Sequence, residues 1–230
     1  MKLYSGPLSL FSRKVEIALA EKGLSYEREM VAFSQTEGYA PKHPAVIAAN
    51  PKGQVPVLVD GDLALFDSTV ILEYLDEAYP EPPLMPREAK ARARCRLLEL
   101  TADEILLKPL SRLMYRTEPE SPDPIRRRQL DDEAARAEQE LAGMYRLVEQ
   151  KLEGPYLCGG FSIADVAMVM SVMYSLRLGG PRLDAVPELQ AWYERAIGRP
   201  SVAAVVTEVT EADRLLSRPV GQDSSGGGRS

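Results

Sequence analysis

The chain has 230 residues, of which 45% are hydrophobic and 27% charged, and its net charge at pH 7 is −6. This composition is typical of folded globular proteins and allows one large domain or two small ones. The acidic balance disfavours nucleic acid as a partner, because phosphate binding needs a basic surface. One histidine and two cysteines, Cys95 and Cys158, disfavour a metal site or a dithiol site. No apolar run is long enough to span a bilayer, so we expect a cytoplasmic protein without membrane contact.

The first 79 residues alternate between strand and helix patterns. Strands are predicted at 2–5, 26–31, 55–59 and 63–66, and helices at 12–23, 45–49 and 68–79. Gly61 and Asp62, between the last two strands, are typical of a hairpin turn. The order β-α-β-α-β-β-α predicts a small α/β domain, 1–79, with one sheet of mixed strand directions.

Prolines mark the end of this domain. Four of them occur in 80–86, which excludes a helix or a central strand and predicts a linker. Beyond the linker, helical patterns at 87–115 and 125–152 predict an all-α domain over 87–216.

A second helix signal lies further along the chain. Ser162 and Asp165 have the spacing of a capping box and predict the start of a buried central helix over 165–174. The Ser/Gly-rich end of the chain, 217–230, is predicted to be a disordered tail.

Four short motifs occur in a fixed order along most of the chain: Phe11-Ser12-Arg13-Lys14-Val15, Asn50-Pro51-Lys52-Gly53-Gln54-Val55-Pro56, Phe66-Asp67-Ser68 and Phe161-Ser162-Ile163-Ala164-Asp165. In this order they resemble the cytosolic glutathione transferases. The resemblance implies a thioredoxin-like N-terminal domain, an all-helical C-terminal domain and a homodimer. It also implies that glutathione binds as a substrate and that a small hydrophobic electrophile accepts its sulfur.

The resemblance implies where glutathione binds. Val55-Pro56 would be a cis pair whose Val55 backbone bonds the peptide by strand addition, and the start of the helix at Ser68 would hold the γ-glutamyl carboxylate. An ordinary trans proline is the alternative for Pro56, whereas a plain helix cap at Ser68 is compatible with the binding role. The predicted glutathione contacts are His43, Gln54, Val55, Pro56, Asp67 and Ser68. For His43, the only histidine, a solvated loop position is an equal alternative.

The chemistry needs a hydrogen-bond donor beside the glutathione sulfur, because the thiolate is the nucleophile. Ser9, just before the first helix, matches the serine-type members and is the first candidate. Ser12 is the second, since the helix could begin there, and Tyr4 falls inside a strand where core packing is expected. The lack of Cys at position 9 argues against thioltransferase activity, and Leu10 next to Phe11 argues against the zeta-type isomerases.

Conjugation of the thiolate to an apolar electrophile therefore remains as the expected reaction, although peroxide reduction, dehalogenation and ether cleavage use the same thiol site. The electrophile pocket is expected to be lined by Leu8, Leu10, Phe11, Arg112, Met114 and Tyr115.

A non-catalytic function is the alternative. Segments at 3–7, 20–23, 74–77 and 82–86 are similar to the stringent starvation protein A proteins, which have the transferase fold, bind bacterial RNA polymerase and lack the activity. Glu81, where those proteins carry His, and Ser9, which they lack, favour the enzyme.

Overall fold

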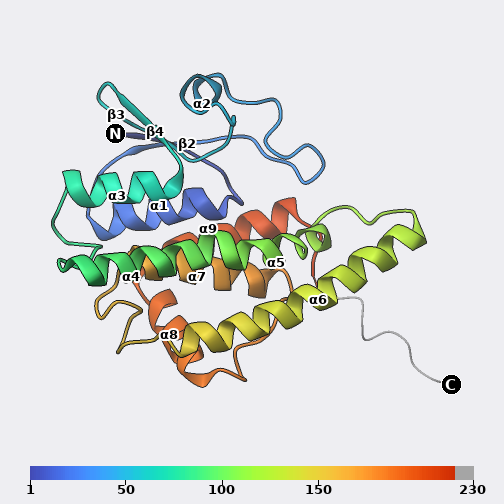
Figure 1. Ribbon diagram of the computed structural model, residues 1–230. Helices are drawn as coiled ribbons and strands as arrows, with labels where there is room; N and C mark the ends of the chain where they lie inside the picture. The colour runs from blue at the N-terminus through green and yellow to red at the C-terminus, as the bar shows by residue number, and fades with distance from the viewer. Residues whose placement is uncertain (221–230) are drawn as a thin grey trace.

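The structure is a computed structural model and describes residues 1–220 (Figure 1). The N-terminal elements, in chain order, are β1 (Lys2–Ser5), α1 (Leu10–Glu21), β2 (Glu27–Met30), α2 (Pro44–Ala49), β3 (Val57–Asp60), β4 (Leu63–Phe66) and α3 (Ser68–Ala78). The strands form one four-stranded sheet in the order β2-β1-β3-β4. β1 pairs parallel with β2 and antiparallel with β3, and β3 pairs antiparallel with β4. The predicted mixed sheet is thus confirmed.

Helices α1 and α3 lie between this sheet and the helices of the second half of the chain, whereas α2 lies on the far side (Figure 1). The layering follows from the burial pattern: Leu3 of β1 and Val15 and Leu19 of α1 are fully buried, as is Ile71 of α3. Apolar side chains at helical spacing on α1 and α3 therefore cover one face of the sheet.

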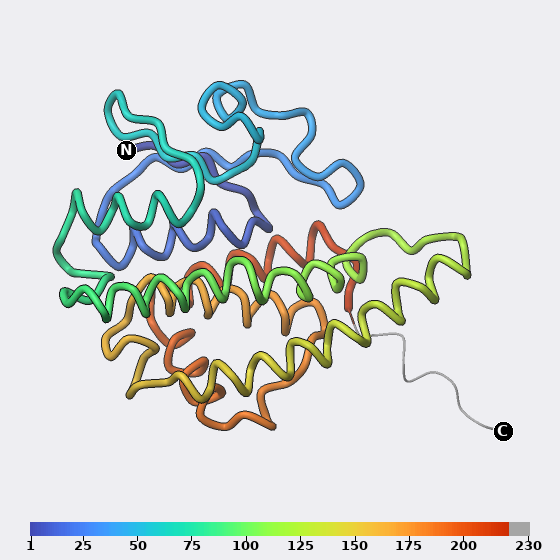
Figure 2. The backbone as a smooth tube through the Cα atoms, viewed as in Figure 1, coloured from blue at the N-terminus to red at the C-terminus, as the bar shows by residue number. Residues whose placement is uncertain are grey.

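The second half is all helical, as predicted. Its elements are α4 (Ala89–Leu100), the π-helical turn η1 (Thr101–Leu106), α5 (Leu107–Ser111), the 3-10 turn η2 (Met114–Thr117), α6 (Pro124–Glu149), α7 (Ile163–Arg177), α8 (Pro187–Ile197) and α9 (Pro200–Leu216). Figure 2 shows α4 and α6 running in opposite directions. None of the helices described is long and apolar enough to cross a bilayer.

The predicted single helix over 87–115 is divided in the structure. After α4 the backbone passes through the π-helical turn η1, and α5 ends at Ser111. Pro109 explains the irregularity, because it has no N–H to donate to the Ile105 carbonyl one turn before it. The helix changes its hydrogen-bond register next to this proline and stops soon after it.

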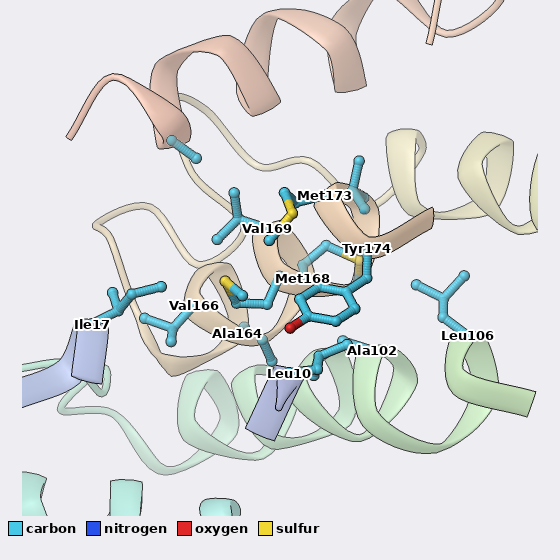
Figure 3. Close-up of a cluster of buried hydrophobic side chains, with 14 of the residues drawn as sticks. Leu10, Ile17, Ala102, Leu106, Ala164, Val166, Met168, Val169, Met173 and Tyr174 are labelled. Carbon is cyan, nitrogen blue, oxygen red and sulfur yellow. The ribbon is translucent and has the colours of Figure 1, made fainter. Parts of the chain in front are cut away.

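Helix α7 is the centre of the core, as the capping box predicted. The Ser162 N–H donates to Asp165 Oδ2 at 2.9 Å, and the helix is buried on all sides from Ile163 to Ser175. Figure 3 shows Met168, Val169 and Tyr174 of α7 among side chains from other elements, including Leu10 and Ile17 of α1 and Ala102 and Leu106 of η1. One continuous hydrophobic core therefore joins the α/β part to the helical part.

The chain continues in contact with the fold after α9. The Arg218 N–H donates to the Thr117 carbonyl at 2.9 Å. The rest of the predicted tail, 221–230, lies outside the described residues.

Candidate functional site

Ser9 lies at the N-terminus of α1, where it caps the helix and is 9% exposed. Its Oγ accepts hydrogen bonds from the Ser12 N–H at 3.2 Å and from the Ser12 hydroxyl at 3.0 Å. Because the Ser9 oxygen accepts twice, its own proton is available for a third group. Ser12 is fully buried and its proton is directed to Ser9. The helix begins two residues before the predicted 12–23, so it is Ser9 that lies at the positive end of its dipole.

The loop before β3 is held by Asn50. Its Nδ2 donates to the Gln54 carbonyl at 2.7 Å, and Gly53 has a positive φ of 59°, which glycine adopts without steric cost. The Val55-Pro56 peptide that follows is cis, as the resemblance predicted. The turn places Val55 two residues before the third strand, which begins at Val57.

The start of α3 differs from the prediction in one respect. Asp67, not Ser68, caps the helix: its φ is 73° and its Oδ1 accepts from the Thr69 N–H at 3.0 Å. The expectation that Ser68 caps the helix was therefore wrong. Ser68 is the first helical residue, so its N–H is one of those without a partner inside the helix. The Ser68 Oγ accepts from Lys14 Nζ at 3.3 Å.

These segments meet at a cavity of about 700 Å³ between the α/β part and the helical part. Its lining includes five predicted contacts, Gln54, Val55, Pro56, Asp67 and Ser68, and also the predicted pocket residue Phe11. The opposite wall comes from the predicted helical segment 87–115, as expected for the electrophile pocket, but from residues other than those predicted. It consists of Glu99, Leu100, Asp103, Glu104, Leu107, Lys108 and Ser111, from α4, η1 and α5.

Other predicted residues lie elsewhere. Ser9 and Ser12 are outside the described lining of this cavity. Leu10 is 5% exposed and belongs to the core beside Tyr174, as Figure 3 shows, and Leu8 packs against the same core. Arg112, Met114 and Tyr115 line a second cavity of about 580 Å³, which shares Ser111 with the first.

His43, a predicted glutathione contact, is outside the described lining of the cavity. Its Nε2 lies 2.8 Å from Glu29 Oε1, and its ring centroid lies 5.1 Å from that of Tyr4. Tyr4 packs against a second, smaller cluster of buried side chains, Val31, Val46, Val55 and Val57, which is the packing role expected for it.

A buried ion cluster underlies the cavity. Lys14 is fully buried; its Nζ donates to Glu99 Oε1 at 2.8 Å and also bonds Asp103 Oδ2. Thr69 Oγ1 donates to the same Glu99 oxygen at 2.6 Å. Burial raises the pKa of Asp103 to about 6, an effect that the neighbouring Lys14 opposes. The cluster ties α1 and α3 to α4 and η1 directly behind Ser68.

Sequence reasoning missed Glu99 and Asp103. Their spacing of four residues placed both on one helix face. Nothing local placed Lys14 opposite them, because that contact joins residues 85 and 89 positions apart.

Comparison with known proteins matches both halves of the chain. The N-terminal domain of glutathione S-transferases matches residues 3–83, and their C-terminal domain matches residues 109–200. A glutathione transferase homolog from Sulfitobacter, solved with bound glutathione, has a TM-score of 0.72 and 27% identity over 90% of this chain and 97% of that one.

Two curated relatives carry another name. A stringent starvation protein A homolog of Coxiella burnetii is 49% identical over 100 residues, 43% of this chain and 44% of that protein. The chain thus aligns with less than half the length of this relative. A stringent starvation protein A homolog of Haemophilus influenzae is 31% identical over 211 residues, 90% of this chain and 91% of that protein.

Proposed function

Since the chain belongs to the glutathione S-transferase family through both of its domains, we propose that it ionises the thiol of glutathione and adds it to a hydrophobic electrophile. The observation that carries the proposal is the cavity in which the Val55-Pro56 pair and the Asp67-Ser68 helix start meet. These are the two glutathione-binding features that the resemblance implied, and they come from separate elements. We place the reaction in the cytoplasm, where glutathione is kept reduced.

Glutathione binding is supported by the polar groups of the cavity. The γ-glutamyl carboxylate would accept from the Ser68 N–H, at the positive end of α3, with Lys14 behind the Ser68 hydroxyl. The Asp67 oxygen that does not cap α3 would face the γ-glutamyl ammonium. The peptide portion would pair with the Val55 backbone, in the manner of an added strand.

Thiol activation is assigned to Ser9. A free thiol has a pKa of about 8.5, and a hydroxyl donor at a helix N-terminus lowers it. The two hydrogen bonds from Ser12 orient the Ser9 oxygen and leave the Ser9 proton for the sulfur. Ser12 is then a positioning residue. The thiolate attacks the electrophile, a new carbon–sulfur bond forms, and the leaving group departs with its electron pair.

The electrophile is assigned to the wall opposite glutathione. Phe11, Leu100 and Leu107 supply apolar surface on that side of the cavity. Ser111 connects it to the second cavity, with Arg112, Met114 and Tyr115, which we propose receives the far end of a long substrate.

A homodimer is proposed through the side of the molecule on which α3 and α4 lie next to each other (Figure 1). Large apolar side chains are exposed on these two helices: Val70 is 49% exposed and Leu97 is 64% exposed. Such a face is costly to leave in water and is typical of a contact between subunits. Light scattering should give twice the mass of one chain, and a monomeric mass would contradict the dimer.

The enzyme is tested by retention on immobilised glutathione together with conjugation of a generic aryl halide. Ser9→Ala should lower kcat/KM more than tenfold, or about 1.4 kcal/mol. Ser12→Ala is the matched control, since it keeps the backbone bond to Ser9, and it should cost less than tenfold. A larger loss for Ser12→Ala than for Ser9→Ala would contradict the assignment.

A non-catalytic binding protein resembling stringent starvation protein A is the second candidate. It is favoured by the relative from Haemophilus influenzae and by the position of Ser9 outside the lining of the cavity. In this case the chain would neither be retained nor turn over, and it would co-elute with bacterial RNA polymerase in gel filtration.

A further inference from the structure

The segment between β2 and α2 folds back toward the N-terminal end of α1, and both lie on the same side of the molecule in Figure 2. Two hydrogen bonds close it: Ser34 N–H to the Gly38 carbonyl at 3.0 Å and Gly38 N–H to the Ser34 carbonyl at 2.8 Å. The Phe33 and Tyr39 rings pack with centroids 4.8 Å apart. This closed loop, 33–39, presents Tyr39 to the turn that leads into α1.

The Tyr39 hydroxyl lies within the turn that ends at Ser9. A Cβ atom built on Gly6 would be only 2.1 Å from Tyr39 Oη, so the phenol rests directly on the Gly6 backbone. The Leu8 amide and the Ser9 hydroxyl lie beside the same oxygen. Among residues 1–220, Tyr39 Oη is buried and has no hydrogen-bond partner of ordinary geometry. Burial raises the pKa of Tyr39, so the phenol is neutral at pH 7.

This position is the one that a sulfur atom bound to Ser9 would need. The Ser9 hydroxyl and the amides at the start of α1 are the donors that would stabilise a thiolate. The phenol oxygen lies beside this turn, against Gly6, and Ser9 is only 9% exposed. A phenol and a thiolate cannot occupy one place.

We infer that Tyr39 controls access to Ser9: its side chain occupies the sulfur position, and glutathione reaches Ser9 only when the loop 33–39 carries Tyr39 away. The inference rests on the proposed function. Tyr39 is not a catalytic residue here, because it leaves before the sulfur arrives.

The expected size of the effect follows from the population of the open state. If Tyr39 is displaced in about one molecule in ten, the apparent Kd for glutathione is about ten times the intrinsic value. Truncating the Tyr39 side chain should remove this tenfold increase in the apparent Kd. A residue that only supported the loop would weaken binding when truncated, so a gain in affinity separates the two roles.

Gly6 offers a second and independent variant. Gly6→Ala introduces a Cβ that would lie 2.1 Å from Tyr39 Oη. This clash should displace the Tyr39 side chain without changing Tyr39 itself. Gly6→Ala and Tyr39→Ala should have the same effect, and the double variant should gain no more than either single variant, because both act on one contact.

The experiment measures the Kd of reduced glutathione by titration calorimetry for the full chain and these variants. We expect binding to be about tenfold tighter in Tyr39→Ala and in Gly6→Ala. Tyr193→Ala is the control, a tyrosine of α8 at the opposite end of the molecule, and should leave the Kd unchanged (Figure 1). The urea midpoint gives a readout without ligand: Gly6→Ala should lower it in the wild type and not in Tyr39→Ala.

Three results would overturn the inference, and they differ from one another. If the wild type binds glutathione and Tyr39→Ala binds equally or more weakly, the access role is wrong while the proposed function stands. If none of the proteins binds glutathione, the proposed function fails and the access role fails with it. If Gly6→Ala changes the urea midpoint equally in the wild type and in Tyr39→Ala, a side chain at position 6 does not compete with Tyr39 for space.

Discussion

Asp165 holds four hydrogen bonds in the centre of the helical half, and its loss is the sharpest test of what stabilises the fold. Oδ1 accepts from the Leu157 N–H at 2.9 Å and from Trp192 Nε1 at 2.8 Å. Oδ2 accepts from the Ser162 N–H at 2.9 Å and from the Ser162 hydroxyl at 2.7 Å. The carboxylate thus connects the start of α7, the segment before it and α8. Asp165 itself is fully buried.

The cost of Asp165→Ala can be worked from these bonds. Each buried donor left without a partner costs about 1–3 kcal/mol, and three of the four donors cannot turn away. Burial raises the pKa of Asp165, which shows that the buried charge is itself unfavourable, so removing it offsets part of the cost of the unpaired donors. We expect a net loss of about 3–5 kcal/mol, a large share of the 5–15 kcal/mol typical of a folded domain.

Urea unfolding followed by the fluorescence of Trp192, the only tryptophan, reports this loss directly. Asp165→Asn keeps one acceptor oxygen and turns an amide group toward the other two donors, so its loss should be smaller than that of Asp165→Ala. Asp132→Ala, an exposed acid of α6, is the matched control and should change the free energy of unfolding by less than about 0.5 kcal/mol. A loss below about 1 kcal/mol for Asp165→Ala would refute the role of these hydrogen bonds.

Three further predictions concern the cavity and its surroundings. Lys14→Met leaves the buried carboxylates of Glu99 and Asp103 without their cation and should cost about 3–5 kcal/mol in thermal unfolding, whereas a change below 1 kcal/mol would show the ion cluster to be dispensable. Burial raises the pKa of Asp103 to about 6, so the folded protein binds a proton at Asp103 more tightly than the unfolded chain does. The contribution of Asp103 to the free energy of unfolding should therefore fall as the pH rises from about 4 to about 6. Urea unfolding of Asp103→Asn across this range should lack that fall, and a contribution that increases with pH would contradict the assignment. Gly53→Ala puts a Cβ on a backbone with φ 59° and should cost about 1 kcal/mol while raising the KM for glutathione, and an unchanged KM would separate the loop from the binding site.

Much of this protein was readable from local patterns. The order of strands and helices along the N-terminal half, the Ser162–Asp165 capping box and the Asn50 turn depend on residues within a few positions of one another, and all three are present in the structure. Helix ends were predicted less closely. Pro109 interrupts a run of good helix formers, and no local rule states whether such a helix kinks, ends or changes its hydrogen-bond register.

The tertiary structure decided which residues lie opposite each of the predicted motifs. The resemblance implied that Val55 and Ser68 share one site, and the pairing of β3 with β4, Val57 opposite Phe66, brings the two motifs together. The wall of α4 and η1, the cation of Lys14 behind Ser68 and the phenol of Tyr39 in front of Ser9 were not readable in this way. Each depends on packing between elements far apart in the chain, where helix and loop positions follow from the fit of whole surfaces and not from the identity of neighbouring residues.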